Sequence, residues 1–404
     1  MDKTSKKLTI KYAFLQGSYW VGQCIIYSFA AVYLQHKNFN NTHIGIVLSL
    51  SAIISIILQP MVSAFADKFK KKSVRGIILT LMAIVLAFAI LLFISANSFL
   101  ITGGVFVIIN AIQFTLNPLL NSFALEYLNN GYSFNFGLAR GSGSIAFAIS
   151  SFFLGHGVSK FGPGILIPLF ILSYGLFFLA AYSFKLKDTN IPKPSTSNNT
   201  ISPGVDNSEN APASIIGFFT KYKKFTFFLI GIAMVFYSHG LINTYLINII
   251  ENVGGNSSDM GLSLTIAAAL ELPMMASFVI IINKIKCNNI IKISAFFFFI
   301  KTAIIWLASN VFFVHLSMAF QMLSFALFTP ASVYYVNSII NKEDRVKGQS
   351  MLGTATLGVA GTIAYITGGK VLDTSGVSNM LMLGTIVSLI GFIVIMFSTE
   401  ESEV

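Results

Sequence analysis

Apolar runs of about twenty residues recur along almost the whole chain, and they constrain its fold more than any other feature. Residues 76–95, for example, read GIILTLMAIVLAFAILLFIS and carry no charge. A hydrocarbon core about 30 Å thick is crossed by roughly 20 apolar residues in an α-helix. With 55% hydrophobic and only 10% charged residues, the chain is too apolar for a soluble surface. We therefore expect a membrane protein.

Polar breaks divide these runs into twelve predicted spans. Backbone groups in lipid must be hydrogen-bonded within helices or closed barrels, and the runs lack the period-two alternation of barrel strands. The spans are accordingly predicted to be helices. They cover 12–34, 43–66, 75–95, 99–127, 137–158, 163–184, 225–249, 258–283, 289–308, 311–339, 348–369 and 378–398.

An internal repeat predicts how these helices are grouped. QPMVSAFADKFKKKSVRGII around Pro60 parallels LPMMASFVIIINKIKCNNII around Pro273, and RGSGSIA from Arg140 parallels LGTATLG from Leu352, with nearly equal displacements. Such agreement indicates a duplicated unit, the design of alternating-access carriers. We predict an all-α membrane protein of twelve transmembrane helices in two pseudo-symmetric six-helix bundles.

A polar stretch separates the two predicted bundles. Residues 188–214 are rich in Ser, Asn and Pro, which is typical of a flexible linker. The predicted domains are an N-terminal bundle over 1–187, a cytoplasmic linker over 188–214 and a C-terminal bundle over 215–404.

Basic residues predict the orientation in the membrane, because Lys and Arg are retained on the cytoplasmic side. Most of the 26 Lys and Arg residues fall at the N-terminus, between 68 and 75, between 185 and 224, and near 284–292 and 342–347. Both termini are therefore predicted to be cytoplasmic, in a multi-pass protein of the plasma membrane. The net charge of +11 is thus a topology signal rather than a sign of nucleic-acid binding. The first helix lacks a cleavage site and is expected to be retained.

Three ionisable residues lie deep inside predicted spans, namely Arg140, Glu271 and Lys301. Such residues are expensive in lipid, so each is a candidate functional residue. Burial of a carboxyl group favours its protonated form, which makes Glu271 a candidate proton carrier modulated by Lys301. A structural pair of Glu271 with Lys301 is an alternative that is compatible with coupling. For Arg140, the functional interpretation is contact with a solute or a carboxylate, and the alternative is an ion pair that serves helix packing.

Polar residues at helical spacing predict a cavity or helix–helix contacts. In the fourth span the amides are spaced three, four and four residues apart, which places them on one stripe. Interhelical hydrogen bonding or ordinary packing is the alternative for each set. The candidates for binding a solute are Asn110, Gln113, Asn117 and Asn121 in the fourth span, Trp20, Gln23 and Tyr27 in the first, His239 and Asn243 in the seventh, and Gln321 in the tenth.

The segment QPMVSAFADKFKKK at the end of the second span resembles the loop signature of the major facilitator superfamily, G-x-x-x-D-[RK]-x-G-[RK]-[RK]. Asp67 and Lys68 match it, whereas Ser63 and Lys70 stand where glycines are usual. In that family these loop residues latch helix ends together in one conformation. The resemblance therefore implies that Asp67 and Lys68 form a conformational latch; anchoring by positive charge is the alternative.

The segment FNFGLARGSGSIAFA at 134–148 resembles the fifth-helix signature of the branch that contains the lactose permease and phenylpropionate permease types. By this resemblance Arg140 would contact substrate. That branch usually carries a carboxylate in its fourth helix, but Ser122 stands at that position here. Glu126, one turn after Ser122, is a candidate substitute in proton coupling. Lys301 falls where the lactose permease carries its coupling arginine, whereas Gln321 stands in place of its histidine.

These features predict a secondary active transporter. The favoured function is proton-coupled uptake of a small polar organic solute, such as a sugar or oligosaccharide, by alternating access. Uptake of an aromatic acid or a nucleoside, and proton-antiport export of amphipathic drugs, remain open. The sequence has no P-loop, no H-E-x-x-H and no His/Cys cluster, so we expect no enzyme activity, metal or cofactor. The expected partners are the solute, protons and the lipid bilayer, with no nucleic acid and no obligate protein partner.

Overall fold

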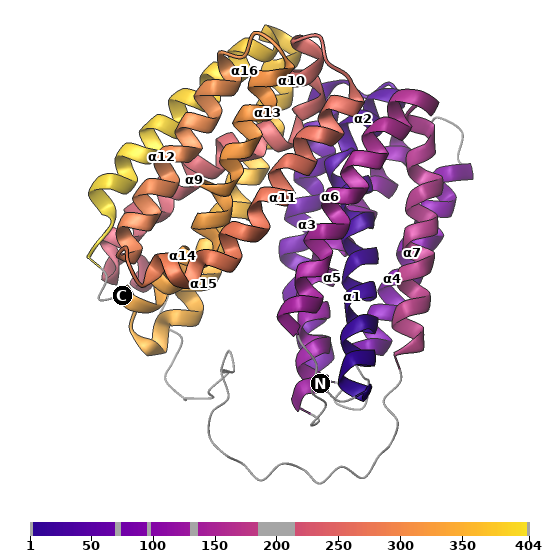
Figure 1. The fold of residues 1–404 in the computed structure, drawn as a ribbon, viewed down its shortest axis with the longest axis horizontal. Helices are drawn as coiled ribbons and strands as arrows, with labels where there is room; N and C mark the ends of the chain where they lie inside the picture. Colours follow the sequence, from indigo (N-terminus) through magenta and orange to yellow (C-terminus); the bar gives the residue numbers. More distant parts are fainter. Residues whose placement is uncertain (1–2, 69–73, 95–97, 130–135, 185–214, 402–404) are drawn as a thin grey trace.

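The computed structural model describes residues 3–68, 74–94, 98–129, 136–184 and 215–401, and most of these residues are helical. Figure 1 shows two lobes, one coloured indigo to magenta and the other orange to yellow. The chain is thus an all-α protein, as predicted. The predicted linker over 188–214 lies outside the described residues, as do the side chains of Asp67 and Lys68.

The N-terminal lobe begins with a helix interrupted by a π-helical turn. This turn covers Cys24–Ser28 and joins α1 to α2. The helices of the lobe are α1 (Lys3–Gln23), α2 (Ala30–His36), α3 (Asn41–Lys68), α4 (Val74–Ile94), α5 (Phe99–Asn129), α6 (Phe136–Phe161) and α7 (Leu166–Ser183).

The C-terminal lobe ends in a long helix that is broken once. At Gly376 the backbone has φ 81° and ψ 177°, a conformation that favours glycine, so α16 consists of two helical segments. The elements of this lobe are α8 (Ile215–Lys221), α9 (Lys223–Thr244), α10 (Leu246–Asn252), α11 (Ser257–Ile282), α12 (Cys287–Trp306), α13 (Val311–Ala319), α14 (Phe325–Ile339), α15 (Arg345–Gly353) and α16 (Gly361–Ser398).

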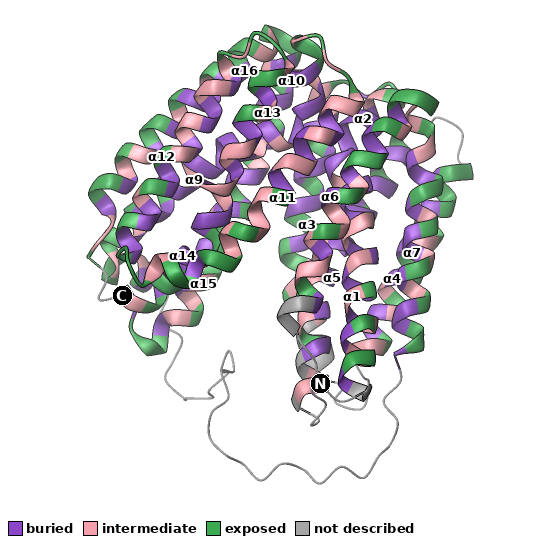
Figure 2. Cartoon of the chain, viewed as in Figure 1, coloured by how far each residue is buried: buried purple, intermediate pink, exposed green. Residues whose placement is uncertain are grey.

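Nine stretches of the described residues are long and apolar enough to cross a membrane. The last of them, 342–398, contains the break at Gly376 and covers two predicted spans. The first and fifth predicted spans are also helical, although they are not among the nine. Exposed residues recur along the helices in Figure 2. Many exposed side chains are large and apolar, such as Leu172 and Phe397. The chain is therefore a multi-pass membrane protein, and its helices are consistent with twelve spans.

The two lobes are joined at the end opposite the start of α1 and the end of α16 (Figure 1). There the Asp373 carboxylate accepts hydrogen bonds from the backbone N–H groups of Asn41 (3.2 Å) and Thr42 (2.7 Å), at the N-terminus of α3. The side chains of both residues also donate to it. A carboxylate is favourable at this position because it satisfies N–H groups that have no partner within the helix.

Glycines allow the helices to approach closely at this joined end. A Cβ atom at Gly45 of α3 would lie 2.1 Å from the backbone oxygen of Tyr365 in α16. A Cβ atom at Gly261 of α11 would lie 2.4 Å from the backbone oxygen of Ser151 in α6. Any larger residue would therefore force the backbones apart.

The described hydrogen bonds between the lobes all lie between the joined end and the middle of the helices. Toward the other end the lobes diverge in Figure 1. If the termini are cytoplasmic, as the lysine distribution predicts, this conformation faces inward.

On the side of the termini, Asp344 lies between two predicted spans and ties the start of the C-terminal lobe to α15. Its carboxylate accepts hydrogen bonds from the Lys221 ammonium (2.8 Å), the Tyr222 hydroxyl (3.1 Å) and the Lys347 ammonium (3.3 Å). The hydrogen bond from Lys221 is the main cause that lowers the pKa of Asp344 below its usual value. The carboxylate therefore stays charged at neutral pH and holds α8 in place.

We expect Gly45→Leu to oppose closure of the joined end, because the new side chain would collide with a backbone oxygen rather than with a flexible side chain. Spin labels at the exposed residues His36 and Asn252 would report this, since α2 and α10 lie at that end. Their mean distance should increase. Gly104→Leu is the control, because a Cβ there meets no atom within 4 Å. An unchanged distance in Gly45→Leu would contradict the steric account.

Candidate functional site

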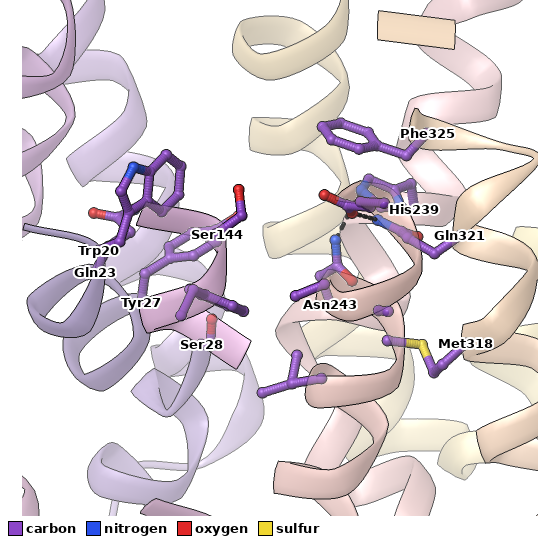
Figure 3. Close-up of a pocket in the computed structure, with 15 residues that line it drawn as sticks. Trp20, Gln23, Tyr27, Ser28, Ser144, His239, Asn243, Met318, Gln321 and Phe325 are labelled. Atoms are coloured by element: carbon purple, nitrogen blue, oxygen red, sulfur yellow. Dashed lines mark hydrogen bonds between the residues drawn. The ribbon is translucent and has the colours of Figure 1, made fainter. Parts of the chain in front are cut away.

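A central cavity of about 230 Å³ lies between the lobes and is lined by both of them. Figure 3 shows Trp20, Gln23 and Tyr27 of the N-terminal lobe opposite His239 and Asn243 of the C-terminal lobe. Aromatic rings with a few convergent polar groups are typical of sites that bind small molecules. The lining consists of Trp20, Gln23, Tyr27, Ser28, Ser144, Phe147, His239, Asn243, Leu264, Ala267, Ala268, Glu271, Met318, Gln321 and Phe325.

The wall from the N-terminal lobe is shaped by the end of α1 and the π-helical turn after it. Such turns are frequent at functional sites. Here the turn carries Tyr27, whose hydroxyl lies 3.0 Å from that of Tyr365 in the other lobe. Trp20 packs edge-on against Tyr19 and Phe147, with ring centroids 5.6 Å and 6.3 Å apart. The indole is therefore held in place before any solute binds.

The wall from the C-terminal lobe is centred on His239. Its ring stacks on that of Phe325, with centroids 5.2 Å apart and planes 14° from parallel. Its Nε2 lies 2.9 Å from the side-chain nitrogen of Asn243, which can donate a hydrogen bond to it. The Nδ1 of His239 and the Oε1 of Gln23 are buried without a partner among the described residues. Buried polar atoms are normally satisfied, so these two atoms are available to a solute.

A hydrogen-bonded chain leads from the cavity to a buried lysine. Gln321 donates from Nε2 to Glu271 Oε1 at 3.0 Å, and its own Oε1 accepts a hydrogen bond from the Lys301 ammonium. Glu271 and Gln321 line the cavity, whereas Lys301 lies behind them with only 1% of its surface exposed. Opposite charges are thus joined through an amide that faces the cavity.

Irregularities in the helices position the side chains of this hydrogen-bonded chain. Gln321 lies in a short 3₁₀ turn, Phe320–Met322, between α13 and α14, and Glu271 lies two residues before Pro273 inside α11. The backbone of Lys301 accepts a hydrogen bond from the Ser317 hydroxyl at 2.8 Å, which fixes α12 against α13. Irregular backbone at this depth is tolerated in membrane proteins where it lines a cavity or is buried in protein.

The four amides predicted on the fourth span lie in α5 and do not line the cavity. Asn110 is buried and donates to the backbone oxygen of Phe106 at 3.1 Å. The backbone oxygen of Gln113 accepts a hydrogen bond from the Tyr19 hydroxyl, so α5 is bonded to α1 there. Asn117 and Asn121 are half-buried. The stripe is thus buried or half-buried outside the cavity lining in this conformation.

Two further predicted residues, Arg140 and Glu126, lie outside the cavity lining. Arg140 is exposed on α6, one turn before Ser144 and on the same face, so it lies on the side of the cavity nearer the termini. Glu126 of α5 is half-buried and accepts a hydrogen bond from the backbone N–H of Val74, at the start of α4. Its position is that of a cap on a helix N-terminus.

Several lining residues were not among the predicted ones. Ser144 follows Arg140 by one turn and Phe325 follows Gln321 by one turn, so helical spacing could have found these two. Small or apolar residues such as Ala267 and Met318 carry no signal that separates lining from packing. Among the described residues, no group of three metal-ligating side chains is close enough to hold an ion.

Two helical lobes around a shared polar cavity define a secondary transporter of the major facilitator type. The chain belongs to the MFS_1 like family, whose model matches residues 12–396. That is a family of membrane transporters and not one of enzymes.

Two relatives of the chain are transporters as well. The chain is 23% identical over 388 residues to the Uncharacterized transporter YwbF of Bacillus subtilis, covering 94% of this chain and 92% of that protein. It is 21% identical over 381 residues to the maltose permease of Geobacillus stearothermophilus, covering 93% and 91%.

Solved structures show the same fold. The crystal structure of a mutant of the nucleoside transporter NupG matches with a TM-score of 0.79 at 15% identity, over 98% of this chain and all of that one. An auto-inhibited POT family peptide transporter matches with a TM-score of 0.68 at 10% identity, covering 96% of each chain.

We expect Gln321→Leu to lower the apparent melting temperature, because Lys301 would lose its hydrogen-bond acceptor while it stays buried. A buried donor left without its acceptor costs about 1–3 kcal/mol, and more when the donor is charged. The triple variant Glu271→Gln/Gln321→Leu/Lys301→Met should recover most of the loss, since it removes both buried charges. Gln349→Leu, which also removes a glutamine of this lobe, is the control. A triple variant no more stable than Gln321→Leu alone would contradict the pairing.

Proposed function

We propose that the protein takes up a small polar organic solute together with a proton, by alternating access across the plasma membrane. The observation that carries the proposal is that Glu271 and Gln321 belong both to the cavity lining and to the hydrogen-bonded chain that ends at Lys301. A solute and a proton would thus act on the same side chains. Both termini are taken to be cytoplasmic.

The solute that fits this cavity best is a sugar. The faces of Trp20 and Phe325 offer apolar contact to a ring, while the unpaired atoms of Gln23 and His239 offer hydrogen bonds to hydroxyl groups. Ligand pockets typically measure about 300–1,000 Å³. A cavity of about 230 Å³ therefore favours a small sugar over a long oligosaccharide. The maltose permease among the relatives, and the resemblance of 134–148 to the lactose permease branch, support this choice.

The proton would bind at Glu271. While the carboxylate is charged, it accepts the hydrogen bond from Gln321 and balances the charge of Lys301. Protonation removes that negative charge, so that Nε2 of Gln321 can donate to a solute instead, while its Oε1 still accepts from Lys301. Solute and proton would then each tighten the binding of the other by one common factor.

The conformational cycle would close the end nearer the termini as the joined end opens, so that the cavity is never open to both sides at once. Arg140 lies on that side of the cavity, where it would meet the solute or one of its anionic groups as the lobes approach. Asp67 and Lys68 would latch the helix ends in the outward-facing state. The loaded carrier would rock inward, release solute and proton, and return empty.

A nucleoside is the second candidate, because aromatic rings line both walls and could stack on a base. Trp20 and Tyr27 lie on one wall and Phe325 on the other. The likeness to NupG also supports this candidate. Binding of an aromatic acid would depend on the charge of Arg140. Export of amphipathic drugs would leave the polar groups of the cavity without a role.

We expect Glu271→Gln to bind solute but to lose the dependence of uptake on a pH gradient, because an amide neither takes up nor releases a proton. Uptake into proteoliposomes with and without an inward proton gradient would measure this. Glu251→Gln, an exposed glutamate at the end of α10, is the control and should behave like the wild type. Full gradient dependence in Glu271→Gln would show that the proton binds elsewhere.

The solute class can be determined in liposomes that contain the wild-type protein and a pH-sensitive dye. We expect sugars added outside to acidify the lumen, because solute and proton would enter together. Acidification by nucleosides alone would favour the second candidate. Proton movement only with cationic drugs would overturn uptake in favour of export.

A further inference from the structure

The N-terminal lobe carries an apolar groove on its outer face, along α1 and between α6 and α7. Figure 1 shows α1 in indigo between these two helices. Three adjoining hollows of about 400, 440 and 650 Å³ make up the groove. Phe14 and Leu176 line both of the first two, and Val21, Ser173 and Leu176 line both of the last two. α1 packs against both α6 and α7, which barely touch each other, so α1 forms the floor.

The walls of the groove are apolar side chains that are exposed. Ile149 and Phe153 of α6 are 53% and 68% exposed, and Leu172 of α7 is 60% exposed. From Lys11 to Ile25 the floor spans about 21 Å at 1.5 Å per residue. The hydrocarbon core of a bilayer is about 30 Å thick. The groove therefore crosses most of the membrane and presents hydrocarbon contacts along its length.

The end of the groove on the side of the termini is cationic. Lys11 lines it, and its ammonium donates one hydrogen bond, to the backbone oxygen of Ser183 at 3.0 Å. Lys7 lies one turn earlier on the same face of α1 and is exposed. Neither lysine forms an ion pair with a carboxylate among the described residues. Arg75 of α4 donates to the neighbouring backbone oxygen of Ala181 at 3.0 Å, which adds a third positive charge.

We propose that this groove binds an anionic phospholipid of the bilayer, with an acyl chain along α1 and the phosphate group at Lys7 and Lys11. An apolar groove alone would accept any lipid, whereas two lysines without carboxylate partners at its end select a negative headgroup. Basic pockets between transmembrane helices on the cytoplasmic side bind such headgroups. The lipid would hold α1, α6 and α7 together.

This site would act on transport through α1 and α6. Trp20 on α1 and Ser144 on α6 line the central cavity, so a lipid that fixes the two helices also fixes part of the solute site. The groove itself is outside the cavity and does not depend on which solute is carried. Transport in liposomes should accordingly be faster when anionic lipid is present.

Native mass spectrometry of the purified protein tests the site directly, with phosphatidylglycerol and phosphatidylcholine of identical acyl chains as probes. Each lysine near the membrane surface contributes about fivefold to binding of anionic lipid. The wild type should prefer phosphatidylglycerol, and Lys7→Gln/Lys11→Gln should weaken its binding by about 25-fold, which leaves only the contribution of Arg75 to the preference. Lys292→Gln, a half-buried lysine on the same side of the other lobe, is the control.

A second variant separates the acyl chain from the headgroup. Gly17→Leu fills the floor of the groove, and its Cβ would meet only Ala146, at an ordinary 3.5 Å. It should weaken binding of both lipids equally, whereas Gly104→Leu should not. Equal binding of the two lipids by the wild type would overturn the proposal. So would displacement of the lipid by inorganic phosphate, because it would reveal an anion site without a lipid groove.

Discussion

A lysine buried almost completely within membrane-spanning helices is the constraint on which the rest of this structure depends. Lys301 keeps its charge only if an acceptor and a negative group lie close by. Gln321 supplies the acceptor and Glu271 the negative charge, and the break between α13 and α14 carries the amide that joins them. Glu271 and Gln321 line the cavity, so a solute or a proton that enters the cavity changes the charge balance around Lys301.

The joined end of the lobes has a different physical character, which suits a gate. Its contacts are hydrogen bonds to Asp373 and close glycine packing, without a buried ion pair among the described residues. A capping interaction at a helix N-terminus contributes about 0.5–2 kcal/mol. Such contacts can be broken and remade without leaving a charge unpaired in lipid. The two conformations of a carrier must be close in free energy, and contacts of this size allow that.

The sequence predicted the helices well because hydrophobic length determines what can cross a bilayer. The predicted span over 43–66 corresponds to α3, and Gly376 separates the last two predicted spans inside α16. Seven predicted residues, among them Trp20, His239 and Glu271, line the cavity, since polar groups in lipid must face protein or water. The amides of α5 show the limit of this reasoning. Their stripe predicts an inward-facing side of the helix, but not which neighbour it meets.

Residues of the cavity that are small or apolar could not be predicted, because Ala267 or Met318 would fit equally well in a packed interface. The position of Glu126 beside the first turn of α4 also depends on tertiary packing, which a pattern along one helix does not contain. Arg140 is exposed in this conformation, and the sequence pattern that singles it out does not say how far apart the lobes lie.

The central claim is that solute and proton bind to one network, and a count of protons taken up with the solute tests it most directly. Calorimetric titration of the purified protein with its solute, in buffers that differ in ionisation enthalpy, yields this number from the dependence of the heat on the buffer. The account predicts uptake of about one proton per solute once the pH is high enough for Glu271 to be charged, falling toward zero in acid. Solute binding with no proton uptake at any pH would contradict it.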